Sequence, residues 1–146
     1  MKILTAAILI ILVMIDISAQ DKRYTHNSEN GYMWLDFEKR MIVKNVKYDF
    51  LSTMLQNEKL KKLSGNYKDE LGCKNEISIL QSNNKQIELN EVISMIDEFY
   101  RNEINLVIPI RYTYCYCIKK LAGIDLRYLE SYKLKLIEFS NSELKK

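Results

Sequence analysis

The stretch FYRNEINLVIPIRYTYCYCIKKLAG, residues 99–123, contains the clearest helix-boundary signals in the sequence. Pro109 suits the first position of a helix, because the N–H group that proline lacks would have no helical partner there. Gly123 suits the position just after a last helical turn. The residues between them predict an amphipathic helix, since apolar side chains recur at three- and four-residue steps: Ile110, Tyr114, Cys117, Ile118 and Leu121.

Three further helical patterns flank this segment. One runs from Trp34 to about Leu63, one follows Asn90, and one begins after Asp125, which can cap it. We therefore predict an all-α fold of about four helices, packed as a compact bundle over residues 33–139. Residues 77–89 leave two alternatives open, a short β-hairpin across Asn83-Asn84 or an irregular loop.

Composition narrows the class of fold and site. The chain has 146 residues, a net charge of +3, four Gly and one Pro, which disfavours turn-rich β-sandwiches and barrels. Its single His, His26, excludes sites built from two histidines. The basic pair Lys119-Lys120 belongs to no nucleic-acid-binding motif, so we expect no nucleic-acid partner.

The N-terminus predicts export. Residues 3–15 are apolar apart from Thr5, too short for a membrane span of about 20 residues, and Ile17-Ser18-Ala19 resembles a cleavage site. We therefore expect a signal peptide at residues 1–19 and a periplasmic or secreted protein without a stable membrane span. The alternative is an uncleaved interfacial or buried helix. Residues 20–32 are predicted to be a flexible leader and residues 140–146 a disordered tail.

The three cysteines are Cys73, Cys115 and Cys117. In an oxidising compartment they suggest one disulfide and one free thiol. Because Cys115 and Cys117 are two apart on a predicted helix, they point to different sides, and Cys73 is expected to pair with one of them. The alternative is three buried thiols. Four-ligand metal binding is not expected, since too few ligands are present.

Ten tyrosines provide the candidate partner surface. Tyr112 and Tyr116 are four residues apart on one predicted helix, and Tyr128 and Tyr132 have the same spacing on the last one. Exposed tyrosines offer a large rigid contact area with a polar tip. The alternative is that both pairs pack against neighbouring helices.

The sequence contains no recognisable set of catalytic residues. His26 lies in the predicted leader, without groups to hold it as a base, and the cysteines have no base nearby in sequence. Asp97 and Glu98, with Arg101, fit a solvated helix face better than a general acid–base pair. We therefore expect a protein that is not an enzyme and has no cofactor.

A family resemblance rests on Phe99-Tyr100, Asn105, Ile108-Pro109-Ile110 and Gly123, with Gly31 and Trp34 upstream. This pattern resembles small exported bacterial all-helical proteins, and more weakly the amidase-immunity proteins of type VI secretion. The resemblance implies an exported all-α domain with no assigned catalytic residue. We interpret Trp34, Tyr100, Asn105, Pro109 and Gly123 as fold determinants and not as a site. Asn105 is also suited by its chemistry to bond backbone groups in a bend.

Two functions follow as hypotheses. The first is an exported, non-catalytic protein-interaction domain, of the inhibitor or immunity kind. The second is a small apolar-ligand carrier of the cell envelope, because methionines such as Met54 and Met95 can line an adaptable cavity.

Overall fold

The computed structural model describes residues 21–39, 45–64 and 72–142. Within these ranges the chain forms a two-stranded sheet, six α-helices and one 3-10 helix: β1 (Tyr24–Thr25), β2 (Ser28–Glu29), α2 (Gly31–Lys39), α3 (Val46–Leu63), α4 (Lys74–Ser82), α5 (Leu89–Tyr100), η1 (Glu103–Asn105), α6 (Ile110–Leu121) and α7 (Leu126–Asn141). The prediction of a mainly helical fold is confirmed. The predicted count of about four helices is too low, and the predicted signal peptide at residues 1–19 lies outside the described residues.

Two helices replace the long helix predicted from Trp34 to Leu63. α2 ends at Lys39 and α3 begins at Val46, after Asn45, whose φ of 81° lies in the left-handed region. A left-handed residue does not continue a right-handed helix, and Asn adopts this conformation more readily than most residues. The apolar pattern continues on α3, where Leu51 is buried, so periodicity alone does not reveal the break.

A helix, α4, also occupies the first half, residues 77–82, of the segment in which a hairpin at 77–89 is one alternative. Leu80 is buried and Ile77 half-buried, three residues apart on one helical face, whereas Ile79 is exposed. The alternation of Ile77 with Ile79 therefore does not indicate a strand. Asn83 and Asn84 end this helix, and Asn84 has a φ of 53°.

Among the described residues, a hairpin lies instead in the segment predicted to be a flexible leader, residues 20–32. β1 and β2 are antiparallel, with Thr25 opposite Ser28, and the two residues between them, His26 and Asn27, both have positive φ. This is the loop geometry that matches the twist of a tight hairpin. Asn30 is buried and holds the hairpin together by donating from Nδ2 to the Lys22 carbonyl and to Thr25 Oγ1.

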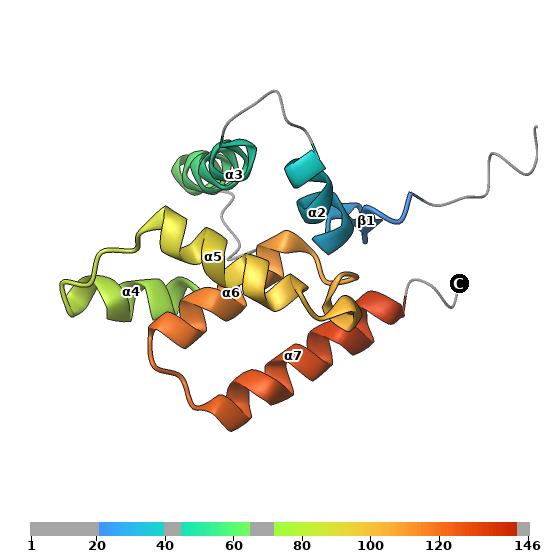
Figure 1. The fold of residues 1–146 in the computed structure, drawn as a ribbon. Helices are drawn as coiled ribbons and strands as arrows, with labels where there is room; N and C mark the ends of the chain where they lie inside the picture. The colour runs from blue at the N-terminus through green and yellow to red at the C-terminus, as the bar shows by residue number, and fades with distance from the viewer. Residues whose placement is uncertain (1–20, 40–44, 65–71, 143–146) are drawn as a thin grey trace, which may run out of the picture.

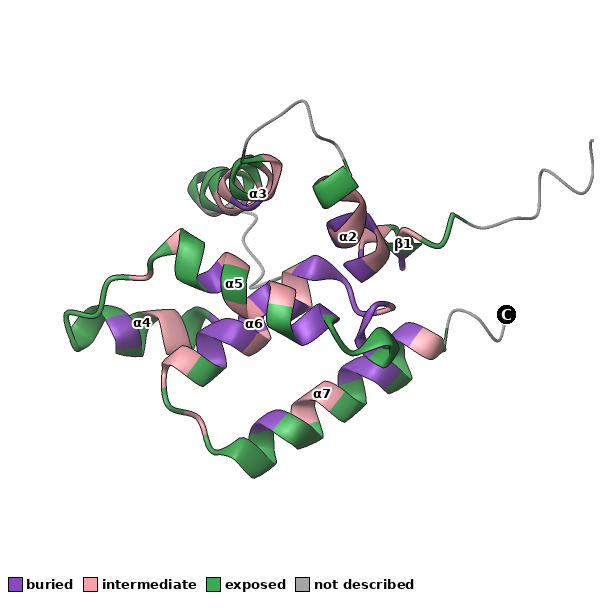
Figure 2. Ribbon diagram, in the orientation of Figure 1, coloured by how far each residue is buried: buried purple, intermediate pink, exposed green. Residues whose placement is uncertain are grey.

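The helices lie in three tiers, as Figure 1 shows: α2 and α3 above, α4, α5 and α6 in the middle, and α7 beneath. α5 packs on α6, α6 packs on both α4 and α7, and α3 packs on α5. Figure 2 shows the consequence, since buried residues concentrate on α5 and α6 while much of α7 and α3 faces outward.

The helix α7 reaches Asn141, and Ser140 is buried, so the predicted disordered tail does not begin at residue 140. Residues 143–146 lie outside the described ranges.

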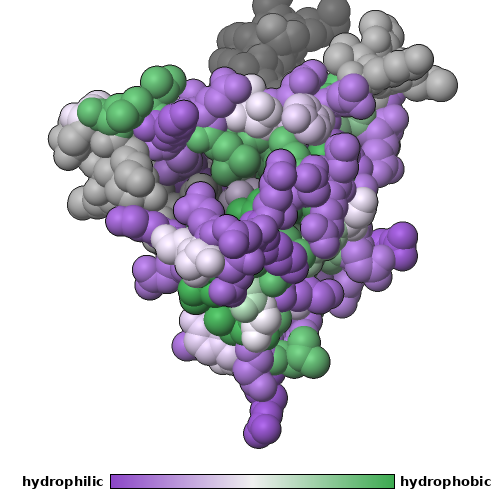
Figure 3. Space-filling model, turned by 90° about the vertical axis from the view of Figure 1, so that its left-hand side faces the viewer, coloured by the Kyte–Doolittle hydropathy of each residue, from purple (hydrophilic) through white to green (hydrophobic). Residues whose placement is uncertain are grey.

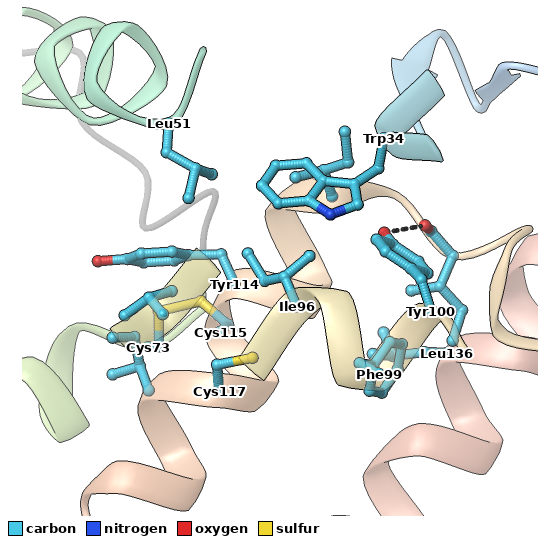
Figure 4. Close-up of a cluster of buried hydrophobic side chains, with 14 of the residues drawn as sticks. Trp34, Leu51, Cys73, Ile96, Phe99, Tyr100, Tyr114, Cys115, Cys117 and Leu136 are labelled. Atoms are coloured by element: carbon cyan, nitrogen blue, oxygen red, sulfur yellow. Dashed lines mark hydrogen bonds between the residues drawn. A yellow bond between two sulfur atoms is a disulfide. The ribbon is translucent and has the colours of Figure 1, made fainter. Parts of the chain in front are cut away.

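The core draws side chains from all three tiers. Trp34 of α2 and Leu51 of α3 point down towards Ile96, Tyr100 and Tyr114, and Leu136 lies beside Phe99 (Figure 4). Two predicted helix boundaries are confirmed, but Asn90, which the sequence favours as a cap, lies inside α5, whose N-cap residue is Glu88. Gly123, with a φ of 78°, follows α6, and Asp125 Oδ1 accepts hydrogen bonds from the first backbone N–H groups of α7.

Candidate functional site

Tyr128 and Tyr132 form a pair of parallel rings on α7. Their centroids are 6.5 Å apart and their planes differ by 7°. The four-residue spacing places them about one turn apart on the same flank of the helix. Tyr128 is 54% exposed, whereas Tyr132 is half-buried. The predicted spacing thus produces a surface ring supported by a second ring.

Three more rings extend this pair into a row. Tyr112 of α6 meets Phe139 of α7 edge to face at 6.0 Å, and His26 of the hairpin stacks on Phe139 at 4.2 Å. Tyr132 and Phe139 are seven residues, about two turns, apart on α7, so the two halves of the row lie on the same face of that helix. We call Tyr128, Tyr132, Tyr112, Phe139 and His26 the aromatic ridge. It runs along the length of α7.

The hairpin reaches the ridge through His26. His26 Nε2 lies 2.9 Å from the carbonyl oxygen of Phe139, so this nitrogen carries the hydrogen and donates it. His26 is one of the two loop residues of the hairpin, and its ring stacks on Phe139 of α7. The single histidine is therefore a packing contact between two distant segments and not part of a leader.

A buried ion pair lies beneath the ridge. Lys119 Nζ is 2.6 Å from Glu76 Oε1, and the two side chains are 7% and 14% exposed. The same ammonium group lies 5.5 Å from the centroid of the Tyr132 ring, within the range of a cation–π contact. Burial, with the neighbouring Tyr128, Tyr112 and Glu76, raises the pKa of Tyr132 to about 12. Tyr132 is therefore a neutral ring at neutral pH, held in place by its neighbours. Because Lys119 is paired with Glu76, it is not available to bind another anion.

Tyr116 does not belong to the ridge, although it shares its spacing with Tyr112. Its ring packs on Phe99 of α5 at 4.8 Å, and its electrostatic neighbours on α7 are Glu130 and Lys133. Burial is the main cause that raises its pKa. The structure thus brings together Tyr112, Tyr128 and Tyr132 and places Tyr116 in the packing between helices, as the alternative interpretation anticipated.

The disulfide joins Cys73, at the start of α4, to Cys115 of α6, with a Cα–Cα distance of 5.4 Å. This resolves the choice between the two partners that the sequence leaves open. Cys117 is free and buried, and burial raises the pKa of its thiol to about 12. A thiol that stays protonated at neutral pH is a poor nucleophile.

Trp34 and Asp97 form a polar junction between α2 and α5. Trp34 is fully buried, and its Nε1 donates to Asp97 Oδ1 at 2.6 Å. Lys47 of α3 binds the same oxygen at 2.6 Å, so three helices meet there. Glu98 and Arg101 form an exposed ion pair, as the solvated-face interpretation expects, but Asp97 has this additional structural role.

Tyr100 and Asn105 secure the turn between α5 and α6. Tyr100 donates from its hydroxyl to the Ile108 carbonyl at 2.8 Å and accepts from Thr113 Oγ1 at 2.9 Å. Asn105 donates from Nδ2 to the Phe99 carbonyl at 2.7 Å. Pro109 stands at the N-cap of α6, one position before the predicted one. These contacts place Tyr100, Asn105 and Pro109 in the same helix hairpin.

The sequence did not indicate Phe139, His26 or the Glu76–Lys119 pair as parts of the ridge or of its support, because each depends on a contact between segments far apart in the chain.

In the part of the chain that the structure describes, no three His, Cys, Asp or Glu side chains lie close enough to hold a metal ion. None of the helices in residues 21–39, 45–64 and 72–142 has the length and apolar character needed to cross a membrane. Comparison of the chain with protein-family models, with curated proteins and with solved structures finds no match.

Proposed function

We propose that the protein is an exported, non-catalytic protein-interaction domain, of the inhibitor or immunity kind, and that it binds a protein partner through the aromatic ridge. The observation that carries the proposal is the row of five rings along α7. Its two most exposed members are Tyr128 at 54% and Phe139 at 44%. Aromatic side chains, tyrosine above all, supply much of the binding energy in protein interfaces.

The ridge is held in place before a partner arrives. Tyr132 is fixed by Tyr128 and by the Lys119 ammonium, and Phe139 is held between Tyr112 and His26. A surface whose side chains are already ordered loses less conformational entropy on binding. This rigidity supports a role in recognition.

The disulfide supports the exported part of the proposal. Disulfides persist in oxidising compartments such as the periplasm and the extracellular space, and they are rare in the cytosol. Cys73 and Cys115 are both fully buried, so the crosslink is an integral part of the core. Together with the apolar N-terminal run, it favours export.

The apolar-ligand alternative has weaker support. A cavity of about 520 Å³ lies between α3, β2 and the start of α6. Phe50, Met54 and Ile110 line it, but so do Glu58 and Arg111. A wall with charged groups suits a lipid-like ligand poorly, because burying them against hydrocarbon is costly. On the side of the molecule shown in Figure 3, hydrophobic residues form small patches among hydrophilic ones.

The test compares partner capture by two single variants of α7. Tyr128→Ala removes the most exposed ring of the ridge, whereas Leu134→Ala removes a similarly exposed side chain, 58%, at another position on the same helix. Both proteins are tagged, purified from the periplasm and used to capture proteins from envelope extracts of the source organism. We expect Tyr128→Ala to lose a partner that wild type and Leu134→Ala both retain.

Equal recovery of every captured protein by the three baits would contradict the role of the ridge. Thermal melts of both variants should match wild type, because neither side chain is in the core. This comparison separates a binding defect from a folding defect.

A further inference from the structure

Two crosslinks, one covalent and one ionic, join the same part of α4 to the same part of α6. The disulfide links Cys73 to Cys115, and the buried ion pair links Glu76 Oε1 to Lys119 Nζ at 2.6 Å. Glu76 follows Cys73 by three residues, and Lys119 follows Cys115 by four. On each helix the two positions are therefore about one turn apart, so the ion pair lies next to the disulfide.

The first turn of α4, which contains Glu76, depends on the disulfide. α4 has nine residues, and helices shorter than about 12–15 residues are marginal in water without tertiary contacts. Cys73 is the N-cap residue, but its side chain makes no capping hydrogen bond. The buried Leu80 anchors the other end of the helix. Without the crosslink, the first turn is therefore the part of α4 that opens most readily.

Lys119 cannot keep its place without Glu76. Its side chain is only 7% exposed, and an ammonium group left unpaired at such a site is strongly unfavourable. Lysine has a long flexible stem, so the ammonium group turns towards solvent when its partner leaves. That movement takes the cation away from the ring of Tyr132, whose centroid is 5.5 Å from it. Tyr132 thereby loses a contact that fixes its ring in the aromatic ridge.

We propose that formation of the Cys73–Cys115 disulfide assembles the aromatic ridge, because it holds Glu76 against Lys119 and so fixes Tyr132. The inference rests on the proposed function, in which the ridge binds the protein partner. In the oxidation, the two thiols give up two protons and two electrons to the disulfide of a thiol oxidant of the envelope, which becomes two thiols.

The burial of both cysteines determines when this happens. Cys73 and Cys115 are fully buried in the folded protein, so their oxidation accompanies folding and does not act on the finished structure. A chain that is still reduced before export therefore lacks an ordered ridge. Binding of the partner is thus confined to the oxidising compartment.

The test observes the two rings directly, through the nuclear Overhauser cross-peak between the ring hydrogens of Tyr128 and Tyr132 in protein labelled with ¹³C-tyrosine. The ring centroids are 6.5 Å apart in nearly parallel planes, so the cross-peak reports their relative position. Tyr128→Phe and Tyr132→Phe assign the signals. Tyr100, which is buried and donates to the Ile108 carbonyl, is the internal control for an intact core.

Three samples are compared with oxidised wild type at neutral pH. Oxidised Glu76→Ala keeps the disulfide but removes the partner of Lys119, and oxidised Glu91→Ala changes an exposed glutamate of α5. The third sample is wild type refolded under reductant. We expect the cross-peak to be lost in Glu76→Ala and in the reduced protein, and to persist in Glu91→Ala. The Tyr100 signal should be unchanged in both variants.

The proposal is overturned if Glu76→Ala keeps the cross-peak, or if the reduced protein shows the Tyr100 signal of a folded core and keeps the cross-peak as well. A reduced protein that does not fold has no ridge, which agrees with the proposal, and oxidised Glu76→Ala then decides it. The measurement needs no partner. It can therefore fail while the capture experiment with Tyr128→Ala succeeds, and the reverse.

Discussion

Breaking the link between Cys73 and Cys115 should remove a large part of the stability of the protein. The two residues are 42 positions apart in the sequence, so the crosslink closes a long loop in the unfolded chain. In the chain-entropy model a loop of this length lowers the entropy of the unfolded state by about 13 cal/mol/K, or about 4 kcal/mol at 25 °C. We expect reduction to cost this amount and to lower Tm by about 10–20 °C.

Urea denaturation measures the loss. Both cysteines are fully buried, so the wild type is reduced in denaturant and refolded under reductant before the comparison. Reduced wild type keeps both sulfur atoms in the core and therefore reports the crosslink alone. The double variant Cys73→Ala/Cys115→Ala should lose somewhat more, because it also loses packing, and its stability should not respond to reductant.

Cys117→Ala is the matched control, since Cys117 is buried on the same helix but is not crosslinked. Oxidised Cys117→Ala should still lose about 4 kcal/mol on reduction. A loss below about 1 kcal/mol in reduced wild type would refute the reasoning, because it would show that the unfolded chain gains little freedom when the 73–115 loop opens.

Three further predictions follow from single positions. Gly31→Ala should destabilise the protein by about 1–3 kcal/mol in urea denaturation, because an added Cβ would lie 2.5 Å from a ring carbon of Tyr100; an unchanged midpoint would contradict this. Between pH 9 and 12 the free energy of unfolding should fall, because burial raises the pKa of Cys117 from 9.0 to about 12 and the unfolded chain releases a proton that the folded chain keeps; the fall should be smaller in Cys117→Ala. The exported protein should begin at Gln20 in N-terminal sequencing, and an intact Met1 would count against a cleaved signal peptide.

The helix hairpin of α5 and α6 is the part of the fold that the sequence predicts best, for a physical reason. Pro109, Gly123 and Asp125 act within one helical turn of their own positions, so their effects can be read from neighbouring residues. Asn105 also acts locally, through a bond to the Phe99 carbonyl six residues earlier. Local rules suffice where the structure is determined locally.

The N-terminal hairpin shows where this reasoning fails. Polar residues at 20–32 suggest a flexible leader, yet Asn30 is buried and His26 bonds to Phe139, 113 residues away. A short, two-residue strand has too few residues for an alternating pattern. Its stability comes from long-range contacts, which no local pattern displays.

The aromatic ridge likewise has one part that local sequence predicts and another that depends on long-range contacts. The spacing of Tyr128 and Tyr132 correctly predicts two neighbouring rings, because four residues make one turn of a helix. The same four-residue spacing places Tyr112 and Tyr116 on one face of α6, and α7 packs against that face. Tyr112 joins the ridge by contacting Phe139 of α7, whereas Tyr116 faces Phe99 of α5. Which ring goes where depends on the position of α7, which the sequence of α6 does not contain.

The position of α7 therefore governs the aromatic ridge. Leu129, Leu136 and Ile137 anchor α7 to the core by apolar contacts, whereas the disulfide secures α4 to α6. The ridge includes Tyr112 of α6 and Phe139 of α7, so it is complete only when α7 is docked on α6. A partner that contacts the rings of both helices therefore also stabilises the docked arrangement of α7.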